Sequence, residues 1–338
     1  MNSVVQKFAC TNPDCTAATT GICLLGKSTP HECEYYIPVD TATSEKKEGE
    51  KAETLKEGRT FHTGFELGTS DMLQVSRGSY THVIGLMGEQ DAGKTCFLLS
   101  LYLMASLKCL SKDYIFRRSL TLQGFEDRAR KLREWKSGPL PQEFADRTTL
   151  VDERCPAFLH LGLSKNDERI DLLFPDLPGE WTTSLMNRAE TADRWEFLKR
   201  ADGIIVVLDG IELMGNGRFV QVTNAKHLFE RLKGTLQVPI DIPLVILVSK
   251  SDEIQMEKPP ILGELTQSAF DLGFAPKVIL CASFSRNPKK VANGVGVFDA
   301  VDHIIAGAPQ ESHINWADFR PGWYTCPPTP FRLFNSQR

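Results

Sequence analysis

The feature that most constrains the fold is an eight-residue loop pattern set between a strand-like run and a helix-like run. Residues 88–95, GEQDAGKT, match G-x-x-x-x-G-K-[ST]. They follow the apolar run HVIGLM (82–87) and open the helix-like KTCFLLSLYLMASL (94–107). In this context glycines let successive backbone N–H groups and a helix N-terminus face phosphate oxygens. The sequence therefore predicts a phosphate-binding loop; the alternative is a glycine-rich turn with a coincidental Lys-Thr.

Two side chains of this loop predict a nucleotide bound with Mg²⁺. Lys94 is expected to reach the β- and γ-phosphates, and the Thr95 hydroxyl to hold the metal. The nucleotide-binding residues expected here are Gly88, Asp91, Ala92, Gly93, Lys94, Thr95 and Cys96.

Beyond the loop, apolar strand-like runs alternate with amphipathic helix-like stretches. The runs occupy residues 82–87, 157–163, 170–174, 203–209, 243–248 and 277–281. The helical stretches occupy residues 94–110, 193–200, 222–233, 262–272 and 296–306. Runs that are continuously apolar indicate strands covered on both faces. The order predicts an α/β fold of the P-loop NTPase kind, with a mostly parallel sheet in a three-layer αβα arrangement.

A second part of the site is expected where the strand-like run 170–174 ends. Asp176-Leu177-Pro178-Gly179 reads as D-x-x-G, in which the aspartate holds Mg²⁺ through water and the glycine N–H senses the γ-phosphate. A glycine is needed because its amide must approach the phosphate without a Cβ. The alternative is an ordinary Asp/Pro/Gly turn.

Base selection is expected after the run 243–248. Ser249-Lys250-Ser251-Asp252 resembles the guanine motif [NT]-K-x-D, with serine in the first place. The Asp252 carboxylate can accept from guanine N1–H and N2–H₂, which adenine lacks, and the Lys250 stem can cover one face of the base. Ala282-Ser283 is placed to contact the guanine carbonyl. The alternative is a polar loop at a strand end.

Four cysteines predict a small separate module at the N-terminus. Cys10, Cys15, Cys23 and Cys33 are spaced C-x4-C-x7-C-x9-C, which brings four thiolates within reach of one structural Zn²⁺. His31 can replace one of them. The spacing departs from paired C-x2-C, so unstructured free thiols and a redox role stay open. Zinc would supply folding energy to a segment that lacks a core.

The order of the loop, D-x-x-G, SKxD and Ala-Ser motifs resembles the TRAFAC-class (Ras-like) P-loop GTPases. Over residues 80–306 this resemblance implies a six-stranded sheet with one antiparallel strand, and switch segments that respond to the γ-phosphate. The Cys-rich N-terminus and several phrases are similar to the double-GTPase type of domain found in prokaryotic conflict-system operons. The phrases are GEQDAGKTCFLLSLY, SLTLQGFEDR, RTT, FLHLGL and DLPGEW. The narrower resemblance implies a bacterial protein with a role in phage defence, beside partners encoded in the same operon.

The resemblance also implies where hydrolysis and switching are controlled. The first switch should lie within residues 111–156, where Thr148 and Thr149 are candidates to reach Mg²⁺ and the γ-phosphate, with Thr148 favoured. Arg147 can act as an arginine finger in cis, or as a surface ion-pair partner. Glu180 stands where many relatives carry a glutamine that orients the attacking water. Because a carboxylate cannot donate to the phosphate, we expect slow hydrolysis and an activating partner.

Composition sets the domain boundaries. We expect a Cys-rich zinc-binding module at residues 1–40, a charged linker (or a frayed helix) at 41–60, the GTPase domain at 61–308, and a tail rich in proline and aromatic residues at 309–338. The linker has too few large apolar side chains to offset its ordering entropy.

Charge and hydropathy exclude several classes of protein. Lys and Arg number 39 against 43 Asp and Glu, for a net charge of −4, which argues against nucleic-acid binding. No apolar run reaches membrane-spanning length, and the N-terminus lacks a secretory leader, so a cytoplasmic protein is expected. The sequence favours a GTP-binding switch with slow GTPase activity. Its rivals are a nucleotide-loaded scaffold with negligible turnover and a P-loop ATPase, and the oligomeric state is left open.

Overall fold

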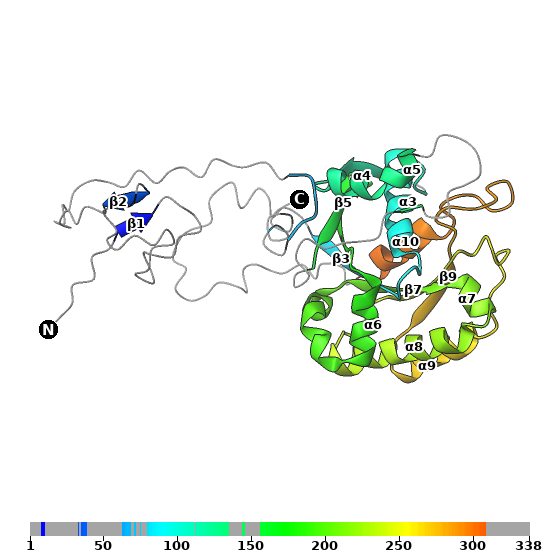
Figure 1. The fold of residues 1–338 in the computed structure, drawn as a ribbon. Helices are drawn as coiled ribbons and strands as arrows, with labels where there is room; N and C mark the ends of the chain where they lie inside the picture. Colours follow the sequence, from blue (N-terminus) through cyan, green and yellow to red (C-terminus); the bar gives the residue numbers. More distant parts are fainter. Residues whose placement is uncertain are drawn as a thin grey trace, which may run out of the picture. The chain divides into compact units, whose positions relative to one another are not determined.

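The chain forms two compact units, Met1–Thr60 and Phe61–Arg338. The computed structural model describes residues 8–10, 33, 35–38, 63–68, 71, 75, 80–111, 113–134, 144–145 and 156–308 (Figure 1). In the first unit, β1 (Phe8–Cys10) pairs antiparallel with β2 (Tyr36–Pro38), and Cys10 lies opposite Tyr36. The predicted linker and C-terminal tail lie outside the described residues.

The second unit is built on one seven-stranded sheet. Its strands are β3 (Thr81–Met87), β4 (Tyr114–Arg118), β5 (Phe158–Lys165), β6 (Glu168–Pro175), β7 (Gly203–Asp209), β8 (Leu244–Ser249) and β9 (Pro276–Leu280). They lie in the order β4-β5-β6-β3-β7-β8-β9. All pairs from β6 to β9 are parallel, whereas β5 runs antiparallel to both of its neighbours. The α/β class and the mostly parallel sheet are thus confirmed.

The prediction of six strands is wrong by one, because β4 adds a seventh at the edge beside β5. This strand, YIFRR, lies in the segment that the sequence assigned to the first switch. Its apolar stretch, residues 114–116, is only three residues long and is followed by two arginines, so it is shorter than the runs that predicted the other strands.

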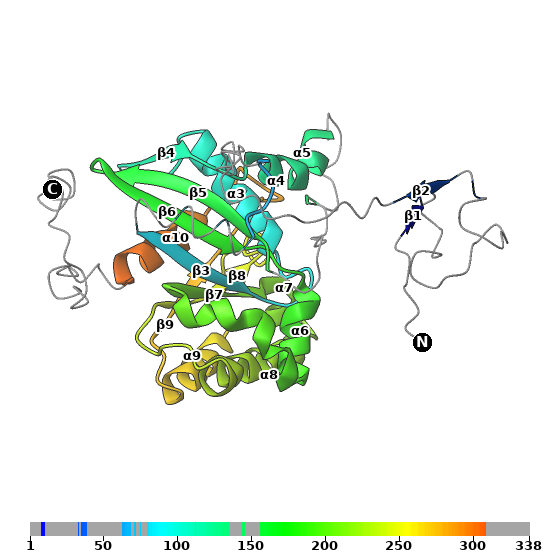
Figure 2. The same ribbon diagram turned by 90° about the vertical axis from the view of Figure 1, so that its left-hand side faces the viewer.

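Helices cover both faces of the sheet, which gives the predicted three layers (Figure 2). The α-helices are α3 (Lys94–Ser106), α4 (Leu122–Arg128), α5 (Arg130–Glu134), α6 (Gly179–Asn187), α7 (Gly210–Met214), α8 (Arg218–Glu230), α9 (Leu262–Asp271) and α10 (Val297–Gly307). A 3₁₀ helix, η2 (Ala189–Arg200), and a π-helical turn, η3 (Arg231–Thr235), complete the set.

The alternation of side chains along the strands assigns each helix to a face. Ile205 and Val207 of β7 pack with α3, α4 and α10 in one core. Ile204 and Val206, which point the opposite way, pack with α6, η2, α8 and α9 in the other. Since both faces are covered, the central strands are continuously apolar.

Within the part of the chain that the structure describes, no helix is long and apolar enough to cross a lipid bilayer.

Candidate functional site

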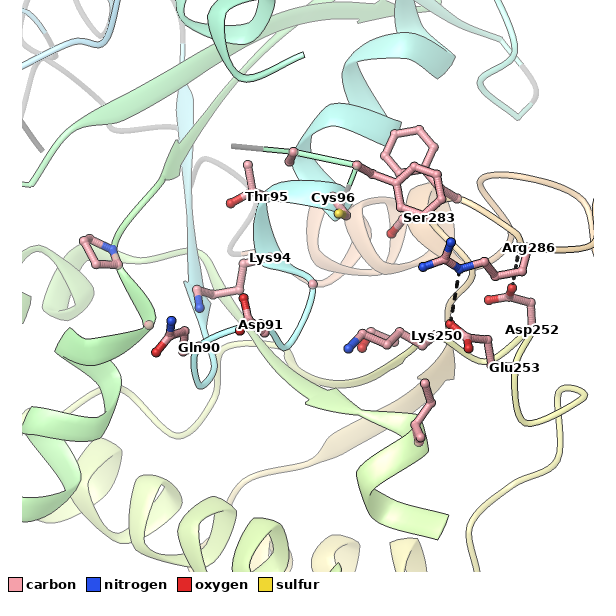
Figure 3. A pocket seen from close by; sticks show the side chains of 18 of the residues that line it. Gln90, Asp91, Lys94, Thr95, Cys96, Lys250, Asp252, Glu253, Ser283 and Arg286 are labelled. Atoms are coloured by element: carbon pink, nitrogen blue, oxygen red, sulfur yellow. Dashed lines mark hydrogen bonds and ion pairs between the residues drawn. The ribbon is translucent and has the colours of Figure 1, made fainter. Parts of the chain in front are cut away.

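A cavity of about 510 Å³ opens where the parallel strands end (Figure 3). The carboxyl ends of β3, β6 and β8 meet at one edge of the sheet, so the loops that follow them converge there. Sequence-predicted residues that line the cavity are Asp91, Gly93, Lys94, Thr95, Cys96, Gly179, Glu180, Ser249, Lys250, Asp252 and Ser283. The structure therefore brings together residues from four separate motifs.

The phosphate loop, residues 88–95, wraps around the Lys94 ammonium. Lys94 Nζ donates to the carbonyl oxygens of Gly88 and Glu89, both at 2.8 Å. Asp91 and Gly93 adopt left-handed backbone conformations, with φ of 58° and 97°, so that the loop can close before α3 begins. The loop is the strand-to-helix turn that anion binding requires.

Burial shapes the chemistry of Lys94, whose side chain is almost wholly enclosed. Burial lowers the pKa of this lysine to about 8, against the opposing attraction of Asp176, Glu180 and other nearby carboxylates. The ammonium is therefore close to titration at physiological pH.

We expect the affinity for GDP to fall as pH rises above about 8. The neutral amine that then forms at Lys94 no longer attracts phosphate, and by linkage the binding constant drops by up to about tenfold per pH unit. Isothermal titration at a series of pH values, in two buffers with different ionisation enthalpies, would measure both the affinity and the proton uptake. An affinity that stays constant from neutral pH to well above 8 would contradict this expectation.

The segment after β6 lies directly against the phosphate loop. A Cβ on Gly179 would lie 2.3 Å from the amide nitrogen of Gln90 and 2.5 Å from its Cα, so only glycine fits. Three residues on, Thr182 Oγ1 accepts from Gly88 N–H at 3.4 Å. Since α6 begins at Gly179, its first N–H groups lie beside the loop.

The carboxylates of Asp176 and Glu180, which precede and follow Gly179 in the chain, differ in environment. Asp176 is buried and pairs with the Arg128 guanidinium. Glu180, in the first turn of α6, is exposed and lines the cavity. The Asp176 side chain is therefore fixed by its ion pair, whereas the Glu180 side chain is in contact with solvent.

At the other end of the cavity, Ser249 packs on the phosphate loop through its Cβ. Ser249 Cβ lies so near Gly93 that a Cβ added to this glycine would be 3.3 Å from it. The Ser249 hydroxyl does not bond to the loop but donates to Leu208 O at 3.2 Å. The serine thus braces β8 against β7 rather than bonding to the loop. Ala92 is buried within the loop, and Ala282 bonds to Val295 through its backbone behind the cavity.

The two charged residues of the SKxD motif are both oriented by neighbours. Lys250 pairs with Asp209, the last residue of β7. Asp252 Oδ2 accepts from the backbone N–H of Arg286 at 2.7 Å. These bonds fix the lysine stem and the carboxylate on one side of the cavity.

The structure adds residues that the sequence reasoning missed. Phe144 stacks on Phe284 with ring centroids 5.4 Å apart, and the Arg286 guanidinium lies 4.9 Å from the Phe144 ring, so an aromatic wall borders the cavity. Asp209 carried a usable signal, because it ends an apolar run as Asp176 does. Arg128 ends the phrase SLTLQGFEDR, but the phrase did not indicate a role in the site, and no motif marked Phe144.

Cys96 is a neutral thiol in this setting. Burial raises its pKa to about 11, an effect that Lys250 and Arg286 only partly offset. The thiol therefore contributes packing to the cavity rather than charge.

Several predicted site residues are not placed. Arg147, Thr148 and Thr149, as well as Cys15, Cys23 and His31, lie outside the described residues. Cys10 lies on β1, and Cys33 carries a free thiol. Within the described ranges, no cluster of three or more His, Cys, Asp or Glu side chains could hold a metal ion.

Among the many solved structures that the chain resembles are two distant ones. One is the RocCORdC structure of Methanosarcina barkeri Roco2 bound to GDP, at 16% identity and a TM-score of 0.36, covering 68% of this chain and 50% of that one. The other is the G domain of the T. maritima FeoB iron transporter, at 12% identity and a TM-score of 0.33, covering 68% and 99%. The chain thus spans half the length of the Roco2 structure. No curated protein matches the sequence.

A family comparison is more informative. Residues 82–305 match the family described as Double-GTPase 2, over more than half of the chain. The match runs from β3 through α10 and so includes the phosphate loop, the D-x-x-G segment and the SKxD motif. The chain belongs to the Double-GTPase 2 family.

Proposed function

We propose that this protein is a molecular switch that binds GTP and GDP and hydrolyses GTP slowly with Mg²⁺. One observation carries the proposal: the phosphate loop and Asp252 line the same cavity of about 510 Å³. The enclosed Lys94 ammonium and the N-terminus of α3 suit the phosphates, and a carboxylate held by Arg286 N–H suits the Watson–Crick edge of guanine.

The side chains near Lys94 fit a magnesium ion. The Thr95 hydroxyl, on the first turn of α3, and the Asp176 carboxylate are hard oxygen donors of the kind that Mg²⁺ prefers. When bound, the ion would neutralise charge on the β- and γ-phosphate oxygens. Within the protein, Lys94 holds the same phosphates, and Gly179 N–H responds to the γ-phosphate. We place Thr148 in the first switch and Arg147 beside it as a candidate finger.

Binding of guanine rather than adenine nucleotides is the direct test. Competition of GDP, ADP and their triphosphates for the protein with Mg²⁺ should show a preference for guanine of at least about 100-fold, the size expected for a carboxylate that reads two donors. Equal binding of ADP would favour the ATPase reading. Guanine binding with no turnover, with or without cell extract, would favour the scaffold.

Glu180→Ala is expected to slow single-turnover GTP hydrolysis by about tenfold or more and to change GDP affinity less than twofold. Glu180 lines the cavity at the start of α6 and can accept a hydrogen bond from the attacking water, the role of a water-positioning residue. The wild-type rate itself should be slow, near the ~10⁻⁴ to 10⁻² s⁻¹ of unassisted GTPases.

Glu196→Ala is the matched control. Glu196 is an exposed carboxylate on η2, paired with Lys199 and outside the cavity lining. It should leave the rate unchanged. A Glu180→Ala protein that hydrolyses GTP like wild type, or a wild-type rate near 1 s⁻¹ without a partner, would overturn the assigned role.

We also propose that the N-terminal unit holds one structural zinc ion. The β1–β2 pairing supports this, because Cys10 lies opposite Tyr36 and Cys33 precedes that residue by three positions. Both cysteines therefore lie at the same end of the strand pair. Metal analysis of the full-length protein under reducing conditions should find one zinc per chain, lost in a Cys10→Ser, Cys33→Ser protein. Zinc at the same level in that double variant would exclude this site.

The cellular setting is the last part of the proposal: a cytoplasmic switch in anti-phage defence that works with an activating or effector protein encoded nearby. The phrases shared with conflict-system domains support it. Phage plating on cells with the wild-type gene or a Lys94→Ala allele tests it, and equal plating would argue against the role.

A further inference from the structure

The Asp176 carboxylate, which ends β6 in the phosphate site, is paired with a buried arginine. Asp176 Oδ2 accepts from Arg128 Nε, and the two side chains are 0% and 8% exposed. The same guanidinium donates to Gly124 O at 2.9 Å and pairs with Glu66 Oε1 at 2.7 Å. Arg128 thus brings a permanent positive charge to a carboxylate on the metal side of the site.

This arginine is held in place by the packing of α4 on α3, the helix that begins in the phosphate loop. Phe125 of α4 stacks on Tyr102 of α3 with centroids 4.8 Å apart, and Tyr102 OH donates to Glu126 Oε1 at 2.6 Å. Arg128 therefore sits on a helix fixed to the nucleotide-binding helix itself.

A second set of bonds ties the start of α4 to the sheet. Leu120 N–H donates to His160 Nδ1 at 3.0 Å, and the His160 backbone N–H donates to Thr121 Oγ1 at 2.8 Å. The ring of His160 also bonds to Asp171 at 2.9 Å. With both its start and its packing face fixed, α4 has little freedom to withdraw Arg128 from Asp176.

A fixed guanidinium has an electrostatic consequence for a second cation. It occupies one carboxylate oxygen of Asp176, and its charge opposes the approach of a divalent ion to the other oxygen. The guanidinium also offsets the desolvation penalty of the buried Asp176 carboxylate. Without it, this unpaired carboxylate would strongly favour binding of a metal ion.

We propose that Arg128 is a positioning residue that acts through Asp176 and sets how strongly guanine-nucleotide binding depends on Mg²⁺. The inference rests on the proposed function. Arg128 makes nucleotide binding depend less on Mg²⁺, because its guanidinium still neutralises the Asp176 carboxylate when the Mg²⁺ concentration is low.

Arg128→Gln tests this through equilibrium binding of GDP across a Mg²⁺ titration, with melting temperature as a second readout. The Mg²⁺ concentration that gives half of the gain in GDP affinity should fall by about tenfold or more. Without Mg²⁺ the variant should melt below wild type, and Mg²⁺ with GDP should restore more of its stability than it adds to wild type. Arg128→Lys, which keeps the charge, should titrate like wild type.

Arg133→Gln is the matched control. Arg133 lies on neighbouring α5, its side chain is 60% exposed, and it pairs with Glu126 rather than Asp176. It removes the same charge and should leave the Mg²⁺ titration unchanged.

The outcomes separate the two proposals. If wild type binds GDP with Mg²⁺ but Arg128→Gln shows unchanged or weaker Mg²⁺ dependence, Arg128 has only a structural role and the inference is wrong. If wild type prefers no guanine nucleotide, the proposed function itself fails. If Arg128→Gln does not fold, the Arg128→Gln, Asp176→Asn double variant should recover folding because the fully buried negative charge at position 176 is removed together with its cation; no recovery would also overturn the inference.

Discussion

A Lys94→Ala protein is expected to lose affinity for GDP and GTP by at least about 100-fold while remaining folded. Lys94 is the cation that the phosphate loop encloses, with Nζ held 2.8 Å from the Gly88 and Glu89 carbonyl oxygens. Charge-assisted bonds to phosphate are each worth about 1.5–3 kcal/mol, and about 1.4 kcal/mol is tenfold in affinity. Loss of two such bonds therefore accounts for the expected effect.

The fold should tolerate this change. Burial lowers the pKa of Lys94 to about 8, which means that the enclosed charge is costly to keep in the protein. Removing it relieves that cost, so the melting temperature without nucleotide should be close to wild type.

Calorimetry with Mg²⁺ measures the affinity, and Lys226→Ala is the control. Lys226 pairs with Glu264 on the surface of α8 and α9 and does not line the cavity. GDP binding undiminished in Lys94→Ala would mean that the phosphates lie elsewhere, and the proposed site would be wrong.

Asp252→Asn is expected to weaken GDP binding by about 100-fold or more and to turn the preference toward xanthine nucleotides. In the structure Asp252 Oδ2 accepts from Arg286 N–H at 2.7 Å. An asparagine should keep that bond with its amide oxygen, which leaves its NH₂ facing the base. Two donors of guanine, N1–H and N2–H₂, then meet a donor, whereas the C2 carbonyl of xanthine can accept from it.

Competition of XDP, GDP and ADP for the variant measures this switch. Asp241→Asn, an exposed change outside the cavity lining, should keep the wild-type order. If Asp252→Asn still prefers GDP, the carboxylate does not read the base, even if the phosphate loop is correct.

The parts of the fold that could be predicted are those whose signal lies in neighbouring residues of the sequence. The phosphate loop is contiguous with its strand and helix, and Asp176 and Asp252 each follow an apolar run, so their convergence follows from parallel strands. The α/β class and the GTPase family were confirmed on this basis. The roles of the individual site residues stay predictions.

What the sequence could not show depends on contacts between distant positions. Arg128 and Asp176 are 48 positions apart, and although Arg128 ends the phrase SLTLQGFEDR, nothing in that phrase indicates which carboxylate it pairs with. The strand β4 was missed because its sequence, YIFRR, is short and ends in two arginines, as suits an edge strand that is buried mainly at Tyr114. Arg128 and β4 both lie between α3 and β5, where tertiary packing rather than local sequence pattern decides the structure.

The seventh strand also decides where another protein can extend this sheet. Since β4 already pairs with β5, the backbone of β5 has no open side for an incoming strand. Among the described strands of this sheet, the two margins left for β-augmentation are those of β4 and β9. On β4 the exposed Ile115 presents an apolar side chain at this margin, whereas the guanidinium of Arg118 is already paired with the buried Asp171.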